Sequence, residues 1–295
     1  MNDAIPFAGA VVYQIEHETR YVHAGRVSTS QHVACLTPRA LPRQHLRTHH
    51  VVVDPVPAND STRLDCYGNV EEQFTILTPY SELRVVSHSV VEVTPREDAV
   101  DPEASPAWED VRSDDGFNVA SEFRYPSPYV EPAPALAAFA LEAFTERRPL
   151  LAAAVALMHR IHDEFEFDPG STTITTPATR VLEERHGVCQ DFAHLQIACL
   201  RSLGLPARYV SGYLLTDPPP GQPRLVGADA SHAWLSVWCP RNGWVDLDPT
   251  NAVLPDTRHV TIAWGRDYGD VSPLHGVVLG GGPHELYVGV SVVPV

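Results

Sequence analysis

The sequence predicts an α+β protein in which a β-rich, sandwich-like N-terminal domain precedes a domain of helices packed on an antiparallel sheet. Residues 11–95 carry β-branched and aromatic residues with partial alternation, interrupted by Pro, Asn, Asp and Gly, which is typical of successive short strands. Residues 134–166 are instead rich in Ala and Leu, two further helical segments extend to Gly204, and three strand-like runs follow. Helices that come before a group of strands favour an α+β arrangement.

Changes in composition set the domain boundaries that we expect. The β-rich domain covers residues 1–96, where regularly spaced strand signals favour a small sandwich or barrel. Residues 97–133 are acidic and proline-bearing with little periodicity, so we expect an exposed linker there. The second domain then covers residues 134–295.

Proline and glycine divide the helical part of the second domain. Pro149 is expected to open a helix within its first turn. A short helix over residues 180–187 is expected to end at Gly187, which can cap it. Another helix is expected to begin at Cys189 and to close at Gly204.

The charge of the chain argues against two classes of partner. Its 37 acidic and 21 basic residues give a net charge of −16 over 295 residues. A field of that sign repels phosphate groups, so we expect neither nucleic acid nor an anionic membrane as a partner. The nearest candidate for a membrane span, residues 150–161, is too short and is expected to be a core helix.

The cysteines indicate a reduced protein without a metal site. There are five, with no CxxC or CxxH spacing, and the N-terminus has no signal-peptide pattern. We therefore expect neither disulfides nor zinc, and we expect a cytoplasmic location, where thiols stay reduced. His45, His49 and His50 lack a carboxylate or cysteine that would complete a ligand set, so we expect no metal and no cofactor.

Cys189 is a candidate nucleophile because of its position just after Gly187, at the predicted start of a helix. The free N–H groups and partial positive charge of a helix N-terminus stabilise a thiolate, and they can also stabilise the oxyanion of a tetrahedral intermediate. A structural cysteine more often lies in mid-helix on an apolar face, as Cys199 is predicted to. This local pattern alone leaves both roles open for Cys189.

A cysteine nucleophile needs a base and a group that orients the base. His232 stands at the start of a strand-like run, and Asp248 stands in the next run, so antiparallel pairing could bring them side by side. Asp246 competes with Asp248, because alternate residues of a strand point to the same face. Since the chain has 15 histidines, a surface role for His232 is the alternative.

Three motifs contain these residues: HGVCQDFAHLQIACLRSLGLPARYVSGYL, SHAWLSVW and GWVDLDPTN. Together they resemble the transglutaminase-like core of the papain-like cysteine enzyme superfamily, and they occur in the family's order. In that family the cysteine after the glycine, the histidine of H-x-W and the aspartate of D-P-T form a catalytic triad. The resemblance therefore implies the triad Cys189, His232 and Asp248, selects Asp248 over Asp246, and implies a papain-like fold for the core.

The resemblance extends over nearly the whole chain. YQIEHETRYVHAGRVSTS and YGNVEEQFTI resemble the β-rich N-terminal region of bacterial transglutaminase-like proteins, and GRDYGDVSPLHGVVLGGGPHELYVGVSVVP resembles the tail of that group. The bacterial branch of candidate cysteine proteases is a better match than the animal crosslinking enzymes. In one respect the chain departs from papain-type enzymes: RVLEERHGV holds no glutamine before the cysteine, so the second oxyanion donor is not identified.

Four further residues are candidates for substrate contact. Trp234 and Trp244 flank the triad strands and could wall a groove, with core packing as the alternative. Gln190 is adjacent to the cysteine, although its direction from the helix is not fixed by the sequence. Tyr268 lies in GRDYGD, where a structural turn is the alternative.

The triad and the resemblance imply a thiol-dependent amide-bond hydrolase, a cysteine peptidase or amidase, that acts on a peptide or protein substrate through a thioester. Protein-glutamine acyl transfer is the alternative, because both reactions pass through the same thioester. A non-catalytic binding or scaffold protein is the third hypothesis. The sequence does not predict an oligomeric state.

Overall fold

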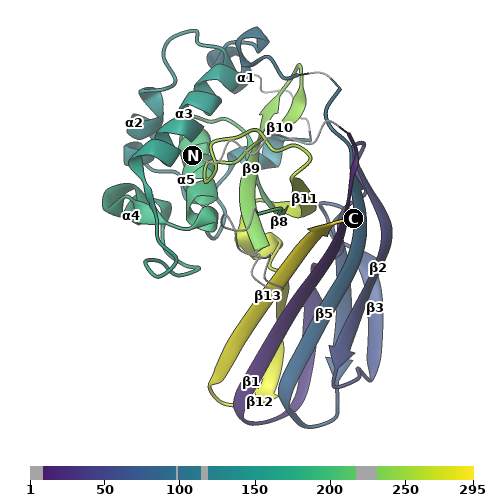
Figure 1. Cartoon of the computed structure of the whole chain (residues 1–295). Helices are drawn as coiled ribbons and strands as arrows, with labels where there is room; N and C mark the ends of the chain where they lie inside the picture. Colours follow the sequence, from purple (N-terminus) through teal and green to yellow (C-terminus); the bar gives the residue numbers. More distant parts are fainter. Residues whose placement is uncertain (1–8, 98, 114–118, 217–230) are drawn as a thin grey trace, which may run out of the picture.

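The computed structural model describes residues 9–97, 99–113, 119–216 and 231–295, and it consists of a sheet of long strands and a smaller sheet covered by helices (Figure 1). Among these residues, the first sheet contains β1 (Val11–Ala34), β2 (Gln44–Asp54), β3 (Asn59–Leu64), β4 (Val70–Ile76), β5 (Tyr80–Val93), β12 (Leu274–Gly280) and β13 (His284–Pro294). The second sheet contains β8 (Ala207–Leu214), β9 (Ser231–Cys239), β10 (Gly243–Leu247) and β11 (His259–Gly265).

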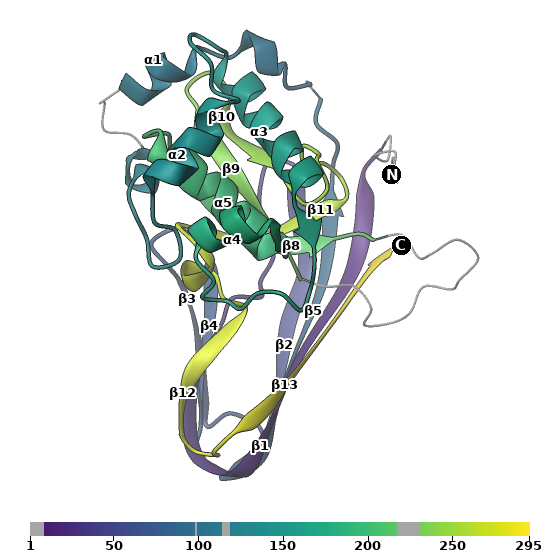
Figure 2. The ribbon, with the colours of Figure 1, turned by 90° about the vertical axis from the view of Figure 1, so that its left-hand side faces the viewer.

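The long strand β1 organises the first sheet, whose order is β2-β5-β1-β4-β3, with β12 and β13 also paired to β1. The first half of β1 pairs with β5 and β13, the second half pairs with β4 and β12, and the register shifts between Val22 and Val27. The two halves enclose a small core that includes Val27, Phe74 and Leu83 (Figure 2). The expected β-rich, sandwich-like region is therefore confirmed.

The C-terminal strands differ from the expected domain division. β13 pairs with β1 from Tyr13 opposite Pro294 to His23 opposite His284, so the chain returns to the first sheet after the second sheet is complete. Assigning the whole of residues 134–295 to the second domain was therefore wrong at its C-terminal end. Alternating apolar residues predicted a strand there, but alternation does not say which sheet a strand joins.

The second sheet has the order β10-β9-β8-β11, is antiparallel throughout, and has helices on one side (Figures 1 and 2). These helices are α2 (Pro134–Leu141), α3 (Leu150–Glu164), α4 (Ala178–Glu184) and α5 (Cys189–Ser202). The predicted α+β class is confirmed. No helix of the described chain combines the length and apolarity needed to cross a bilayer.

Helix α5 lies at the centre of this domain, and every residue from Asp191 to Arg201 is buried. The helix begins at Cys189, as predicted. It ends because Gly204 adopts a positive φ of 77° and the following proline, Pro206, cannot continue a helix. The core helix thus fixes the position of the cysteine at its first residue.

The short helix expected at 180–187 is α4, and it ends earlier, at Glu184. Arg185 takes a left-handed conformation with φ of 59°, and residues 186–187 then form the two-residue strand β7 (His186–Gly187). β7 pairs in parallel with β6 (Glu166–Phe167). Gly187 is therefore the last residue of the short strand β7, which precedes α5, and it does not cap α4.

The expected linker is not exposed throughout. It contains α1 (Trp108–Ser113) and two short 3-10 helices (Pro102–Ala104 and Ser121–Arg124), and it buries Trp108, Val111, Phe123 and Val130. The described acidic residues of this segment lie mainly on its surface, whereas these apolar side chains are buried and hold it against the rest of the protein.

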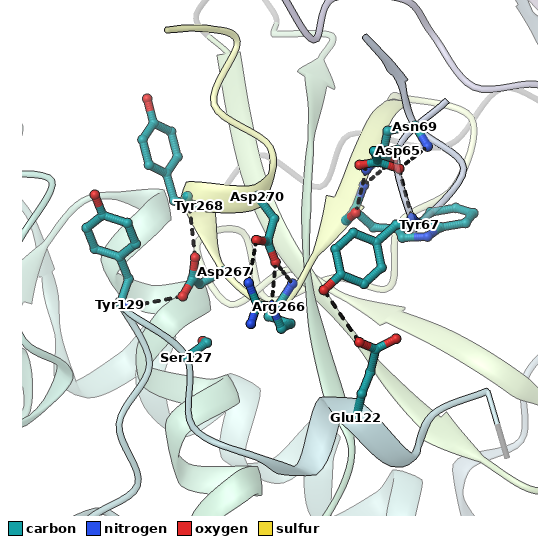
Figure 3. A network of polar contacts seen from close by, with 12 residues as sticks. Asp65, Tyr67, Asn69, Glu122, Ser127, Tyr129, Arg266, Asp267, Tyr268 and Asp270 are labelled. Atoms are coloured by element: carbon teal, nitrogen blue, oxygen red, sulfur yellow. Dashed lines mark hydrogen bonds and ion pairs between the residues drawn. The ribbon is translucent and has the colours of Figure 1, made fainter. Parts of the chain in front are cut away.

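Polar contacts also fix the linker to the second domain (Figure 3). The backbone N–H of Tyr129 donates to Asp267 Oδ2 at 2.9 Å. The buried Arg201 of α5 donates to the carbonyl of Phe123 at 2.9 Å and to Ser127 Oγ at 3.0 Å. The linker is therefore a packed part of the second domain over this stretch.

Candidate active site

Cys189 is half-buried at the first position of α5, where the backbone N–H groups of the first turn have no partner within the helix. Asp191 folds back over the helix start and accepts a hydrogen bond from the N–H of Val188 at 2.9 Å. A Cβ atom on Gly187 would lie 2.9 Å from the Cβ of Asp191, so only glycine leaves room for this contact. The glycine before the cysteine thus serves the local geometry that presents the thiol.

His232 lies at the start of β9 and is 9% exposed. Its Nε2 lies 2.7 Å from Asp248 Oδ2. The thiol of Cys189 lies close enough to the same imidazole to contribute to its electrostatics. Because Nε2 contacts the carboxylate, the other ring nitrogen, Nδ1, is left for the thiol.

Asp248 is completely buried in the turn that follows β10. Its Oδ1 accepts from the backbone N–H of Thr250 at 3.0 Å and of Asn251 at 3.2 Å. Its Oδ2 accepts from the side-chain amide of Asn251 at 2.7 Å and contacts His259 Nε2 at 3.0 Å. The turn therefore holds the carboxylate in one orientation against His232.

Asp246 has a different environment, which separates the two candidate carboxylates. It pairs with Ser236 across β9 and β10 and accepts a hydrogen bond from the Ser236 hydroxyl. The structure thus brings Cys189, His232 and Asp248 together and leaves Asp246 elsewhere on the strand.

Burial and mutual charge shift the pKa values of His232 and Asp248. Burial opposes protonation of His232, but the charge and hydrogen bond of Asp248, with a smaller contribution from Cys189, outweigh it and raise the pKa of the imidazole. Burial likewise opposes ionisation of Asp248, yet contacts with His232 and His259 hold the pKa of this carboxyl well below its usual value. Asp248 thus stabilises the charged form of the His232 imidazole.

Two residues of the site, His259 and Asn251, were not predicted. His259 comes from the start of β11 and is 7% exposed. Only the spacing of Asn251 in GWVDLDPTN could have suggested it, and nothing distinguishes His259 among the other histidines of the sequence.

Three potential ligand atoms of His232, Asp248 and His259 lie within 4.8 Å of one another. Hydrogen bonds account for this closeness, because both imidazoles and the amide of Asn251 converge on the same carboxylate oxygen. An amide N–H that donates into the centre of the cluster opposes a cation there. The arrangement fits a hydrogen-bonded triad rather than a metal site.

The two candidate groove tryptophans lie on the other face of the sheet. Leu235 and Val237 of β9 belong to the core under the helices, so Trp234, an alternate residue, points away from α5. Trp234 is fully buried, and together with Trp244 it lines a cavity of about 410 Å³. Both residues therefore line this cavity, and the ring of Trp234 also lies 6.0 Å from that of His232.

Gln190 and Tyr268 take part in local contacts near the helix start. The amide of Gln190 donates to the carbonyl of Ile174 at 3.2 Å, which ties the preceding loop to α5. The backbone N–H of Tyr268 donates to His194 Nε2 at 3.2 Å, and its side chain lies beside that of Tyr129 (Figure 3). A role of either in substrate contact stays a prediction.

Tyr209 of β8 is a further polar group close to the nucleophile. Its ring lies 4.9 Å from the ring of His194 on α5. Burial, followed by the neighbouring Cys189 and then Tyr268, raises the pKa of Tyr209 well above its usual value. The hydroxyl therefore keeps its proton and can act as a hydrogen-bond donor near the thiol.

Comparisons with known proteins identify the family of the chain. Residues 138–249 match the model of the transglutaminase-like superfamily, whose members are generally cysteine-dependent enzymes, and residues 13–92 match the bacterial transglutaminase-like N-terminal region. An uncharacterized protein of Mycobacterium tuberculosis is 42% identical over 301 residues, covering 99% of this chain and 95% of that protein.

Two further similar proteins have names that state an activity. The crystal structure of a candidate cysteine protease from Cytophaga hutchinsonii has a TM-score of 0.76 at 22% identity, covering 97% of this chain and 91% of that chain. A protein-glutamine gamma-glutamyltransferase of Pseudomonas aeruginosa is 34% identical over 119 residues, which cover 38% of this chain and 18% of that protein. The chain belongs to the bacterial transglutaminase-like proteins, in which a core of the transglutaminase-like superfamily follows a bacterial transglutaminase-like N-terminal region.

Proposed function

We propose that the protein hydrolyses an amide bond of a peptide or protein substrate through a thioester on Cys189. The observation that carries this proposal is the contact of the thiol with an imidazole that a buried carboxylate orients. The thiol stands at the N-terminus of α5, and the imidazole and the carboxylate form a buried pair. Their combination supplies a nucleophile, a base and an orienting group.

In the first half of the reaction, the thiolate of Cys189 attacks the amide carbonyl carbon and forms a tetrahedral oxyanion. The imidazolium of His232 then gives its proton to the amide nitrogen, the C–N bond breaks, and the amine leaves. The product on the enzyme is a thioester. Asp248 keeps its proton-accepting orientation toward Nε2 throughout and stabilises the charged imidazole.

In the second half, His232 removes a proton from water as the water oxygen attacks the thioester carbonyl. The C–S bond breaks, the carboxylic acid leaves, and the thiolate–imidazolium pair is restored. Hydrolysis needs no second substrate site, whereas transfer needs a site that binds an amine and excludes water. Because hydrolysis requires no site for a second substrate, it is the first of the two proposed reactions.

The oxyanion needs donors that are in place before the reaction. The backbone N–H of Cys189 at the start of α5 is one donor in this proposal. The protonated hydroxyl of Tyr209 is the second, in place of the side-chain glutamine of papain-type enzymes.

Acyl transfer to an amine is the second candidate. It is favoured by the 34% identity between part of this chain and the Pseudomonas aeruginosa gamma-glutamyltransferase. In that reaction a lysine-type amine replaces water in the second half, and ammonia is the first product.

One experiment separates the hypotheses. The protein is incubated with a mixed peptide library and a tagged amine, and mass spectrometry follows chain cleavage, deamidation and amine incorporation. Cys189→Ala serves as the inactive variant and Cys66→Ala, a change at an exposed cysteine, as the matched control. Hydrolysis predicts cleavage or ammonia release without incorporation, which disappears only in Cys189→Ala. Incorporation of the amine would favour transfer, and activity retained in Cys189→Ala would refute both.

A further inference from the structure

The cavity behind the triad lies between the two sheets of the protein. One wall comes from the second sheet and includes Arg208, Trp234, Trp244 and His259. The other comes from the first sheet and the segments next to it, and includes Arg43, Gln44, Val93 and Arg96. Its volume of about 410 Å³ is within the range of small-molecule sites.

Two buried polar atoms of this cavity lack a partner among the described residues. They are Nε1 of Trp234, whose side chain is fully buried, and Nδ1 of His259, which is 7% exposed. Their rings lie 5.2 Å apart and nearly perpendicular. A buried polar group without a partner costs about 1–3 kcal/mol, so these two atoms favour a polar occupant of the cavity, and the Trp234 N–H is a donor.

The charges around the cavity favour an anion. Arg43, Arg96 and Arg208 line it against only two carboxylates, Asp246 and Asp256. Arg43 is paired with Asp256 at 2.9 Å. Three guanidinium groups against two carboxylates leave one positive charge to be balanced.

The desolvated arginine of the set is Arg208, which is 7% exposed. Its guanidinium carbon lies 3.8 Å from the ring centre of Trp264 and 4.4 Å from that of Trp244, so aromatic faces hold it in place. Leu41, Val93 and Val210 add apolar wall. The cavity therefore combines a fixed cation and an indole N–H donor with an apolar lining.

We propose that this cavity binds a small carboxylate with an apolar body, the carboxylate taking the Trp234 N–H and the excess guanidinium charge. The proposed binding does not depend on the proposed reaction. The cavity adjoins the triad at two places: His259 contacts Asp248 from the cavity wall, and the ring of Trp234 lies 6.0 Å from the ring of His232.

The test uses the whole protein, labelled with ¹⁵N, and follows the indole N–H resonances. Trp234→Phe assigns the Trp234 signal, and the probe is 3-methylbutanoate, with the neutral 3-methylbutanamide as its isostere. We expect a saturable shift of the Trp234 signal with the acid alone. The signal of Trp108, whose Nε1 donates to the carbonyl of Thr145 at 3.0 Å in the helical layer, should stay in place.

Variants of the chain then test the charge. Arg96→Gln changes an exposed arginine at the cavity and should weaken binding of the acid at least 3-fold. Arg20→Gln, an arginine of the first sheet that stacks on Tyr287, should leave binding unchanged. Equal shifts with acid and amide, or no saturable shift up to 50 mM acid, would overturn the proposal and leave a water-filled cavity.

Discussion

Both sheets of the protein bury histidines, and the two environments have opposite effects on them. In the first sheet, His17 is 2% exposed and pairs through Nδ1 with the hydroxyl of Tyr213 at 2.9 Å. Burial lowers the pKa of His17 to about 4. In the second sheet, His232 is buried to a similar degree, yet the carboxylate of Asp248 raises its pKa.

The two histidines differ in whether a carboxylate lies within hydrogen-bonding distance of the imidazole. Burial alone keeps an imidazole neutral, because the charged form loses its hydration. A buried carboxylate at hydrogen-bonding distance reverses that preference, and here backbone N–H groups hold the carboxylate in place. The proposed triad therefore depends on Asp248 as much as on the cysteine.

The largest effect is expected from removing that carboxylate charge. Asp248→Asn keeps a side chain of the same shape but makes His232 resemble His17, so kcat/KM should fall by about 10³-fold. Asp246→Asn, two residues earlier on the same chain segment, should change kcat/KM by less than about 10-fold. Steady-state kinetics and thermal unfolding of both variants check this. Equal losses in the two variants would contradict the distinction between the two carboxylates.

The two buried tyrosines of β8 also have different neighbours, and we expect different effects when each loses its hydroxyl. Tyr209 and Tyr213 are both buried, but Tyr209 lies by Cys189 whereas Tyr213 pairs with His17. Tyr209→Phe should lower kcat by about 10²-fold with little change in KM, as expected for loss of an oxyanion donor. Tyr213→Phe should leave kcat within about 2-fold and reduce stability instead. An unchanged kcat in Tyr209→Phe would remove this hydroxyl from the mechanism.

The smallest effect concerns the pH dependence of stability. Between pH 6.5 and about 4 the unfolded chain binds a proton at His17 and the native protein does not, so the free energy of unfolding falls as the pH falls through this window. The shift corresponds to at most about 3 kcal/mol, and no further loss arises from this group below pH 4.

His17→Gln should therefore flatten the decline in stability between pH 6.5 and 4, while His50→Gln, a change at an exposed position of β2, should not. Denaturant unfolding across this range measures both. A decline as steep in His17→Gln as in the wild type would show that His17 does not contribute.

The sequence predicted the parts of this site that local motifs encode. The helix start at Cys189 and the D-P-T turn at Asp248 are short-range features, and the structure places both as expected. The support of Asp248 by His259 was not predictable, because it depends on the pairing of β11 with β8, which brings distant segments together.

The same reason explains the differences in the fold. The return of β13 to β1 is a long-range pairing, and strand propensity contains no information on partners. The linker was mistaken for an exposed segment because its anchors, such as Trp108 and Phe123, are isolated apolar residues without periodicity. The cytoplasmic location stays a prediction.

We propose that Asp248, through His232, activates Cys189. The rate of alkylation by iodoacetamide at pH 5.5, followed for each cysteine by mass spectrometry, tests this activation. We expect Cys189, although half-buried, to react at least 10-fold faster than the exposed Cys66, and Asp248→Asn to abolish this difference. A rate for Cys189 no higher than that of Cys66 in the wild type, or an undiminished rate in Asp248→Asn, would contradict it.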